Sequence, residues 1–253
     1  MLPVRDRLPT RRPALVVYLL IFLNVLAFVW SRALLGAGVD PHRFVMAWGL
    51  VPARLMLDPA GEAITVITSM FLHDPTGYLH LGGNMLFLWI FGDNVEDAMG
   101  SLRFAAFYVL CGLLAATAQV AIDPRSVVPM VGASGAISGV LAAYGSLYPR
   151  SPVTVVNPVP ILWLFWGLFF ELPAWVVILE YFAVNLINAW LSVGRQGGGV
   201  AFFAHLGGFV AGLFLVRLFM VGRTTVAHDD WHHFLERGSR PRRARSRRDD
   251  PWW

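Results

Sequence analysis

Residues 200–220 read VAFFAHLGGFVAGLFLVRLFM, and this stretch decides the fold class. The run is long and apolar enough to cross the hydrocarbon core of a bilayer as one α-helix, which takes about 20 residues. His205, Gly208 and Gly212 follow one another at i, i+3 and i+7, so they share one face of that helix. Small residues at such a spacing let helices approach closely in lipid. The stretch therefore predicts a membrane-spanning helix with a histidine on its packing face.

Five further apolar stretches have the same character. They cover residues 14–36, 78–92, 104–122, 134–149 and 173–193. Six spans place both chain ends on one side of the membrane, and both ends are rich in arginine, as the positive-inside rule expects. The pattern predicts an all-α, polytopic membrane protein built as a six-helix bundle. The alternative for 14–36, a cleaved signal peptide, is disfavoured because its apolar run is long.

Two connecting regions are harder to interpret. Residues 37–77 are mixed in character and are expected to form a long loop with short helices. Pro158 and Pro160 interrupt the apolar stretch before Pro173, so we expect 151–171 to be a connector at the membrane interface. The competing interpretation places two spans within 151–192. That count would leave one arginine cluster on the outer side of the membrane.

Composition excludes several classes of protein. Of the 253 residues, 57% are hydrophobic and 14% are charged, whereas soluble domains average about a quarter charged. All basic residues are arginine, so chemistry that needs a lysine Schiff base is excluded. The single cysteine, Cys111, cannot form an internal disulfide and is expected to be a packing residue.

The chain divides into three parts. Residues 1–13 form a basic N-terminal segment, residues 14–220 the membrane domain, and residues 221–253 an arginine-rich tail that we expect to be flexible. Both basic ends are interpreted as cytoplasmic flanks attracted to anionic lipid. Nucleic-acid binding by the tail, or a metal site at its histidines, is not expected.

Polar residues within the predicted spans are unusual and mark a candidate site. His80 and Asn84 lie early in the second span, Ser134 opens the fourth, and His205 lies near the start of the sixth. At 1.5 Å per residue, all four are expected within roughly 10 Å of one membrane boundary. Three clusters that are distant in sequence therefore share one depth.

Other polar residues have simpler explanations. Asn24, Asn185 and Asn188 are expected to form hydrogen bonds between helices, and the role of Glu180 is left open. Gly135, Gly139 and Ala143 recur every four residues in the fourth span. This spacing predicts close packing against the helix that carries His205.

Three motifs together resemble those of the rhomboid intramembrane serine proteases. They are Gly132-Ala133-Ser134-Gly135, Ala204-His205-Leu206-Gly207-Gly208 and His80-Leu81-Gly82-Gly83-Asn84. Phe71-Leu72-His73, Glu96 and Gly100 also look similar, and the resemblance covers about residues 14–220. Each motif alone is weak, but their order and their placement in three different spans are specific.

The resemblance implies a serine endopeptidase that cuts transmembrane protein substrates. It implies Ser134 as nucleophile, His205 as general base, and an oxyanion hole formed by His80, Asn84 and the Ser134 backbone N–H. Gly132 and Gly135 would supply the supporting backbone. Because no aspartate lies in the spans, the site would be a Ser–His dyad in which helix packing orients the imidazole. No metal or other cofactor is expected.

The sequence also departs from the family pattern. Four residues after the nucleophile the family often has an aromatic ring that stacks on the histidine, and here Ser138 stands there. The Trp-Arg pair that some members carry in the first loop is missing at Trp48. These departures leave open how His205 is held and what the loop does.

Competing functions are less compatible with the residues. An H-E-x-x-H metalloprotease motif is missing from the sequence, and no aspartate pair lies in the spans. A transporter would place its polar groups near the midplane, often within an inverted repeat, and no such repeat is evident. An inactive relative that binds membrane helices would have lost the serine or the histidine. The expected location is a bacterial inner membrane, with the site toward the outer face; the physiological substrate and the oligomeric state are not predicted.

Overall fold

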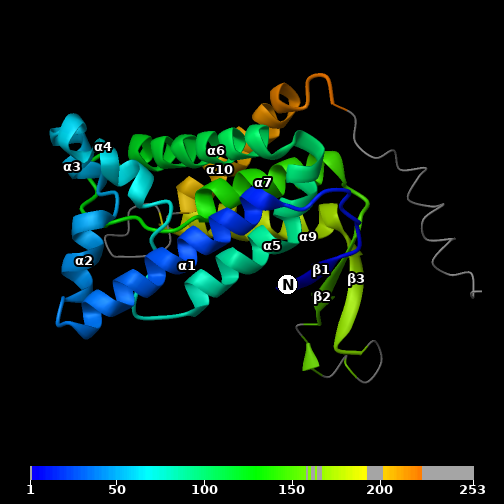
Figure 1. Ribbon diagram of the computed structural model, residues 1–253, viewed down its shortest axis with the longest axis horizontal. Helices are drawn as coiled ribbons and strands as arrows, with labels where there is room; N and C mark the ends of the chain where they lie inside the picture. The colour runs from blue at the N-terminus through cyan, green and yellow to red at the C-terminus, as the bar shows by residue number, and fades with distance from the viewer. Residues whose placement is uncertain (1, 158, 161–162, 164–166, 193–201, 224–253) are drawn as a thin grey trace, which may run out of the picture.

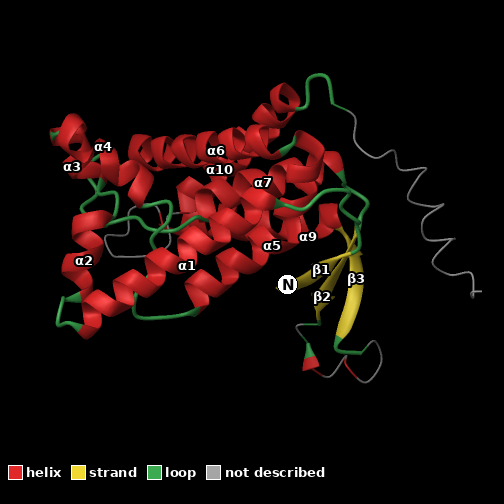
Figure 2. Ribbon diagram, viewed as in Figure 1, coloured by secondary structure: helices red, strands yellow, loops and turns green. Residues whose placement is uncertain are grey.

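The computed structural model describes residues 2–157, 159–160, 163, 167–192 and 202–223. Over these residues the protein is a bundle of helices with a small β-sheet at one end (Figure 1, Figure 2). The long helices are α1 (Leu15–Gly36), α5 (Leu79–Met99), α6 (Ser101–Ile122), α7 (Ser134–Leu147), α9 (Ala174–Ser192) and α10 (Phe202–Phe219). They match the six predicted spans, so the helical membrane bundle is confirmed.

The helices differ in how strongly they resemble membrane spans. Among the described residues, α1, α6, α9 and α10 are long and apolar enough to cross a membrane. Helix α7 is apolar but shorter, and α5 continues past the predicted end at 92 to Met99. Two acidic residues of that extension, Glu96 and Asp97, accept hydrogen bonds from backbone N–H groups at the N-terminal end of the chain.

Glu96 shows what the end of α5 does. Its carboxylate accepts hydrogen bonds from the backbone N–H groups of Val16 and Val17, at 3.0 and 2.8 Å, and from the hydroxyl of Ser101. The first N–H groups of a helix lack partners within the helix and favour a nearby negative charge. Glu96, which is 2% exposed, therefore caps α1 from inside the bundle and joins the start of α1 to α5 and α6.

Helix α7 lies in the middle of the bundle, with α6, α10, α5 and α9 around it (Figure 1). Its residues from Gly135 to Tyr144 are all buried. A Cβ atom placed on Gly208 of α10 would lie 1.9 Å from the Gly135 carbonyl oxygen, and one on Gly212 would lie 2.3 Å from that of Gly139. The two backbones are therefore in direct contact, which confirms the predicted packing of small residues.

The segment between α1 and α5 contains three short helices, as expected. They are α2 (Pro41–Trp48), α3 (Pro52–Leu57) and α4 (Pro59–Thr68), each beginning at a proline. A two-residue bridge pairs Leu50 with Met130, in the loop that leads into α7. The short helices gather at the end of the bundle opposite the sheet (Figure 1), and this pairing places their segment against the start of α7.

The β-sheet was not predicted. Residues 151–171 contain β2 (Pro152–Val156) and the start of β3 (Phe169–Pro173), and the N-terminal segment contains β1 (Leu2–Asp6). The strands pair in the order β1-β2-β3, and both pairs are antiparallel. Val153 and Val155 are buried on one face of β2, an alternation typical of a half-buried strand. Residues 151–171 thus lie between α7 and α9, as expected of a connector, but its strands were not predicted.

Asp6 fastens the sheet to the helices. Its carboxylate accepts hydrogen bonds from Tyr144 of α7 and Asn94 of α5, both at 2.8 Å. Burial, reinforced by the neighbouring Asp93, raises the pKa of Asp6 to about 7. Residues 193–201, which connect the last two predicted spans, and most of the predicted tail, from residue 224 on, lie outside the described residues.

Candidate active site

Ser134 is the first residue of α7, and the chain turns into this helix at Gly132. Gly132 has a φ of +132°, a conformation that favours glycine because it lacks a Cβ atom. Its N–H donates to the Ser69 carbonyl at 2.8 Å, which anchors the loop to the end of α4. Ser134 thus stands at a helix N-terminus, where free N–H groups favour negative charge.

His205 of α10 contacts this serine. Its Nε2 lies 2.7 Å from Ser134 Oγ, and 71 positions separate the two residues in the chain. The contact depends on the glycine-lined apposition of α7 and α10, since one turn further along α10 the Gly208 backbone touches Gly135. The predicted meeting of a hydroxyl and an imidazole is therefore present.

Asn185 is a site residue that sequence reasoning did not find. Its Oδ1 lies 2.5 Å from His205 Nδ1, so α9 supplies a third polar side chain next to the dyad. The expectation that Asn185 bonds between helices is confirmed, but its partner was not foreseen. By contrast, Asn24 donates to the Leu20 carbonyl of its own helix. Nothing in the sequence distinguishes these asparagines.

Tyr181, one turn before Asn185 on α9, lies near His205, where the family often has an aromatic ring and this chain has Ser138. Its ring centroid is 6.4 Å from that of His205, with the planes tilted by 33°. Its hydroxyl is 2.7 Å from Ser138 Oγ, which in turn donates to the Ser134 carbonyl at 2.7 Å. An aromatic ring near His205 is thus present, but it comes from a different helix than the resemblance led us to expect.

His80 approaches Ser134 at Gly132, and Asn84 follows His80 by one turn on α5. A Cβ atom placed on Gly132 would lie 3.0 Å from His80 Nε2 and 3.5 Å from Ser134 Oγ, so the His80 and Gly132–Gly135 motifs meet at Gly132. The Asn84 amide donates to the His80 carbonyl at 3.0 Å and lies 3.0 Å from His73 Nε2. All three predicted motifs are therefore gathered around Ser134.

His73 is a further residue of this side. It is 1% exposed, and its ring packs edge-on against that of His80 at 5.0 Å. Burial, together with His80, lowers the pKa of His73 to about 3. The ring is therefore neutral at physiological pH, and its Nε2 can accept a hydrogen bond from the Asn84 amide.

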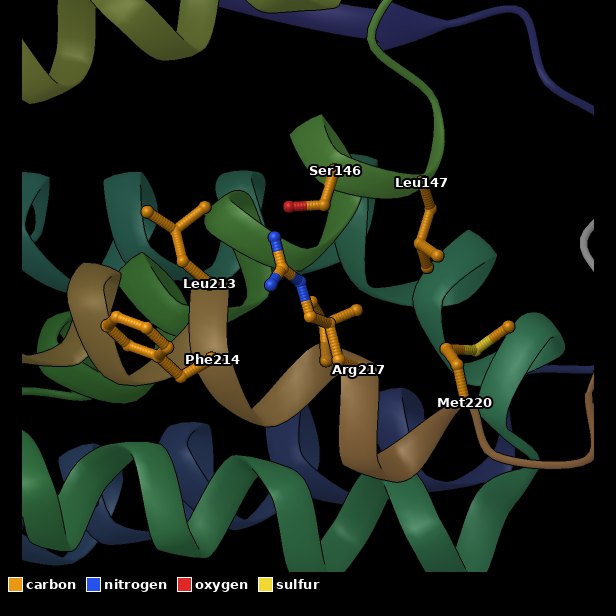
Figure 3. A pocket seen from close by; sticks show the side chains of 7 residues that line it. Ser146, Leu147, Leu213, Phe214, Arg217 and Met220 are labelled. Atoms are coloured by element: carbon orange, nitrogen blue, oxygen red, sulfur yellow. The ribbon is translucent and has the colours of Figure 1, made fainter.

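We also searched for a metal site and for a pocket near Ser134. Among the described residues, no group of three or more His, Cys, Asp or Glu could hold a metal ion. A pocket of about 480 Å³ lies between α7 and α10 and is lined by Ser146, Leu213 and Arg217 among others (Figure 3). Ser146 is twelve positions after Ser134, or roughly 18 Å along the helix at 1.5 Å per residue, so this pocket is separate from the candidate site.

The fold and the site together define a class: helical membrane proteins in which a serine and a histidine meet across two closely packed helices. Comparison with known proteins agrees with this description. The Rhomboid domain model matches residues 60–222. The chain belongs to the rhomboid family.

Relatives come from several kingdoms. Rhomboid protein 1, mitochondrial, of Saccharomyces cerevisiae is 31% identical over 207 residues, covering 79% of this chain and 52% of the relative. RHOMBOID-like protein 5 of Arabidopsis thaliana is 30% identical over 73% of this chain and 52% of the relative. Rhomboid protease GluP of Bacillus subtilis is 34% identical over 50% of this chain and 23% of the relative. The chain thus spans about half the length of the first two relatives, and about a quarter of the third.

Proposed function

We propose that this protein is an intramembrane serine endopeptidase that hydrolyses peptide bonds in or near transmembrane helices of other membrane proteins. The observation that carries the proposal is the 2.7 Å contact between Ser134 Oγ and His205 Nε2. A serine hydroxyl is a weak nucleophile until an adjacent base takes its proton. Family membership supports the same activity, and GluP is a relative whose name includes protease.

In the proposed reaction, Ser134 Oγ attacks the scissile carbonyl carbon while its proton passes to His205 Nε2. The resulting oxyanion would accept hydrogen bonds from the Ser134 backbone N–H, His80 and Asn84. His80 Nε2 supports this assignment by its position next to Gly132. Collapse of this intermediate breaks the C–N bond, and the imidazolium gives its proton to the leaving amine. Water then attacks the acyl-enzyme with His205 as base, which releases the acid and restores the serine.

The proposed protease domain is residues 14–220, which include all of these groups. We place both termini in the cytoplasm of a bacterial cell and the site toward the outer face of the inner membrane. The basic residues Arg5, Arg7, Arg11 and Arg12 before α1 support that orientation. A C-terminal tag should therefore resist protease added to intact spheroplasts and be digested after lysis; digestion in intact spheroplasts would contradict the orientation.

The substrates that fit such a site are membrane helices with a locally unstable segment of small residues, because a peptide bond must leave its helical hydrogen bonding to reach Ser134. The reaction itself calls for no metal or organic cofactor. Cleavage should therefore persist in the presence of chelators.

The test is cleavage of a reporter transmembrane substrate by purified protein in liposomes. Ser134→Ala and His205→Ala should each abolish cleavage, whereas Ser146→Ala should not. Ser146 is a matched control, because it lies on the same helix and donates to the Ala142 carbonyl. Binding of the reporter without cleavage by the unmodified protein would indicate a helix-binding relative instead. Substantial cleavage by Ser134→Ala would remove the proposed nucleophile.

A further inference from the structure

The base of the candidate site is connected to α9 as well as to α7. Asn185 is 7% exposed and lies on the buried side of α9, whereas Val184, Leu186 and Ile187 are exposed. Its amide bonds in two directions. Oδ1 meets His205 Nδ1 at 2.5 Å, and Nδ2 donates to the Tyr181 carbonyl at 2.8 Å.

These two contacts fix which way the amide of Asn185 faces. A backbone carbonyl can only accept a hydrogen bond, so the group facing Tyr181 O must be the NH₂ group. The oxygen of Asn185 therefore faces His205. An amide oxygen can only accept, so Nδ1 of His205 must carry a proton.

The consequence for His205 lies at its other nitrogen. A neutral imidazole carries one proton, and with that proton on Nδ1 the lone pair is on Nε2. Nε2 is the atom 2.7 Å from Ser134 Oγ. Asn185 thus selects the one neutral form of His205 that can take the serine proton.

Tyr181 connects Asn185 back to α7, because its carbonyl contacts Asn185 and its hydroxyl contacts Ser138. Ser138 has one hydroxyl proton, and it is donated to the Ser134 carbonyl. The Tyr181 hydroxyl must therefore be the donor in its 2.7 Å contact with Ser138. The ring runs from Ser134 through His205, Asn185 and Tyr181 to Ser138, and returns to the Ser134 carbonyl.

We propose that Asn185 is a positioning residue for catalysis, which holds His205 in its Nδ1-protonated form and so makes the site a Ser–His–Asn constellation rather than a dyad. It takes the place of the acidic residue of a serine-protease triad, with a neutral amide oxygen in place of a carboxylate. The proposal rests on the proposed function for its catalytic meaning. The protonation pattern it states for His205 is independent of that function.

The first experiment determines which ring nitrogen of His205 carries the proton. Protein labelled with ¹⁵N-histidine would be examined by NMR, with His205→Ala used to identify the His205 signals among those of the seven histidines. Near neutral pH, Nδ1 should be the protonated nitrogen in the unmodified protein. In Asn185→Leu, which keeps a similar volume without an acceptor, this preference should disappear. A proton on Nε2 in the unmodified protein, or an unchanged pattern in Asn185→Leu, overturns the proposal whether or not the protein cleaves anything.

The second experiment measures cleavage of the reporter substrate. Asn185→Leu should lower kcat by about 10²–10³-fold with KM changed little, somewhat less than the ~10⁴-fold cost of losing the correct tautomer in a triad protease. Asn185→Asp keeps an acceptor and should remain within about tenfold of the unmodified protein, the range of one neutral hydrogen bond. Asn188→Leu removes an amide from the same helix, three positions on, and should leave kcat unchanged.

The outcomes separate the two claims. If the unmodified protein does not cleave, the proposed function fails, and the NMR pattern alone decides the role of Asn185. If the unmodified protein cleaves and Asn185→Leu cleaves equally well, the positioning role fails while the Ser134–His205 pair stands. Equal losses in Asn185→Leu and Asn188→Leu would show that α9 merely needs its polar residues for packing.

Discussion

The two sides of Ser134 differ in how many of the hydrogen bonds needed for the proposed reaction are already present. On one side, the Ser134 hydroxyl lies 2.7 Å from its proposed base, His205, which lies 2.5 Å from Asn185. On the other side, the Asn84 amide is engaged by the His80 carbonyl and by His73. A developing oxyanion would have to replace one of these partners of Asn84. We call the side with His205 and Asn185 the base side, and the side with His80, Asn84 and His73 the oxyanion side, after the roles proposed above. The base side is held in place by helix packing, whereas on the oxyanion side Asn84 would have to exchange a hydrogen bond.

The difference follows from the elements that carry each side. The base side joins α7 and α10 through backbones in direct contact, as at Gly208 and Gly135, and α9 is added through the side chain of Asn185. The oxyanion side combines the first two turns of α5 with the loop that holds His73. Catalytic hydrogen bonds often tighten only around the reacting substrate, and the loop-borne side is the one where such a change would occur.

The largest effect is expected from breaking the base side at its packing contact. Gly208→Val would place a branched side chain where even a Cβ atom would lie only 1.9 Å from the Gly135 carbonyl oxygen. Ordinary van der Waals contact begins at 3.4 Å, so helix α10 must shift by more than about 1 Å. A displacement of about 1 Å at a catalytic group already costs on the order of 100-fold in rate, so the loss of cleavage should exceed about 10³-fold. Cleavage assays and thermal unfolding in detergent measure both consequences.

Gly36→Ala is the control for that variant, because a Cβ atom at Gly36 meets nothing within 4 Å. It should leave both cleavage and the unfolding temperature close to those of the unmodified protein. Cleavage by Gly208→Val within tenfold of normal would show that the α7–α10 contact does not hold the base.

The next largest effect tests the oxyanion side. Asn84→Ala removes one proposed donor to the developing negative charge and should lower kcat by about 10²–10³-fold, without reaching the complete loss expected for Ser134→Ala. Since the base side is untouched, the NMR pattern of His205 should stay as it is. A variant with normal kcat would place the oxyanion hole elsewhere.

A smaller effect is expected from removing the Tyr181 hydroxyl on the base side. Tyr181→Phe keeps the ring beside His205 and deletes only the hydroxyl that donates to Ser138. A neutral hydrogen bond contributes about 0.5–1.5 kcal/mol, so kcat should fall by roughly tenfold or less. If steady-state kinetics instead show a loss as deep as that of Asn185→Leu, Tyr181 does more than support α9.

The smallest effect lies far from both sides, at the sheet. Burial raises the pKa of Asp6 to about 7 from a reference of 3.8, so the folded protein binds more protons than the unfolded chain between those values. Stability from this group is therefore full below about pH 4 and is lost as the pH rises toward 7. Asp6→Asn should raise the unfolding temperature at pH 8 by a few degrees, with a smaller difference at pH 5.

Cleavage kinetics provide the check on that variant, because both sides of Ser134 should be unaffected by it. An unfolding temperature that responds to pH equally in Asp6→Asn and in the unmodified protein would contradict the assignment of this titration to Asp6.

The spans and the serine–histidine contact were predictable because each has a local sequence signal. Apolar runs of the right length mark α1, α6, α9 and α10, and the glycines around Ser134 and His205 mark two helices that can touch. The β-sheet lacked such a signal. Its strands are short, β1 lies among basic residues that resemble a membrane flank, and β2 pairs with a partner about 150 positions away.

Asn185 was missed for a related reason. Asparagine in a membrane helix has many partners available, and nothing near Asn185 indicates that its oxygen meets an imidazole twenty positions later. Tyr181 could have been suspected, because Ser138 leaves space where the family often has an aromatic ring. A tyrosine at the right depth on a neighbouring helix is one way to fill that space, but the choice among six tyrosines needs coordinates.

The central claim is that His205 makes the hydroxyl of Ser134 nucleophilic. Its most direct test is covalent labelling by a fluorophosphonate probe in liposomes, with mass spectrometry to locate the adduct. One adduct is expected on Ser134, with little or none in His205→Ala and normal labelling in Ser146→Ala. Labelling of Ser134→Ala to the same extent as the unmodified protein, or undiminished labelling of His205→Ala, would contradict it.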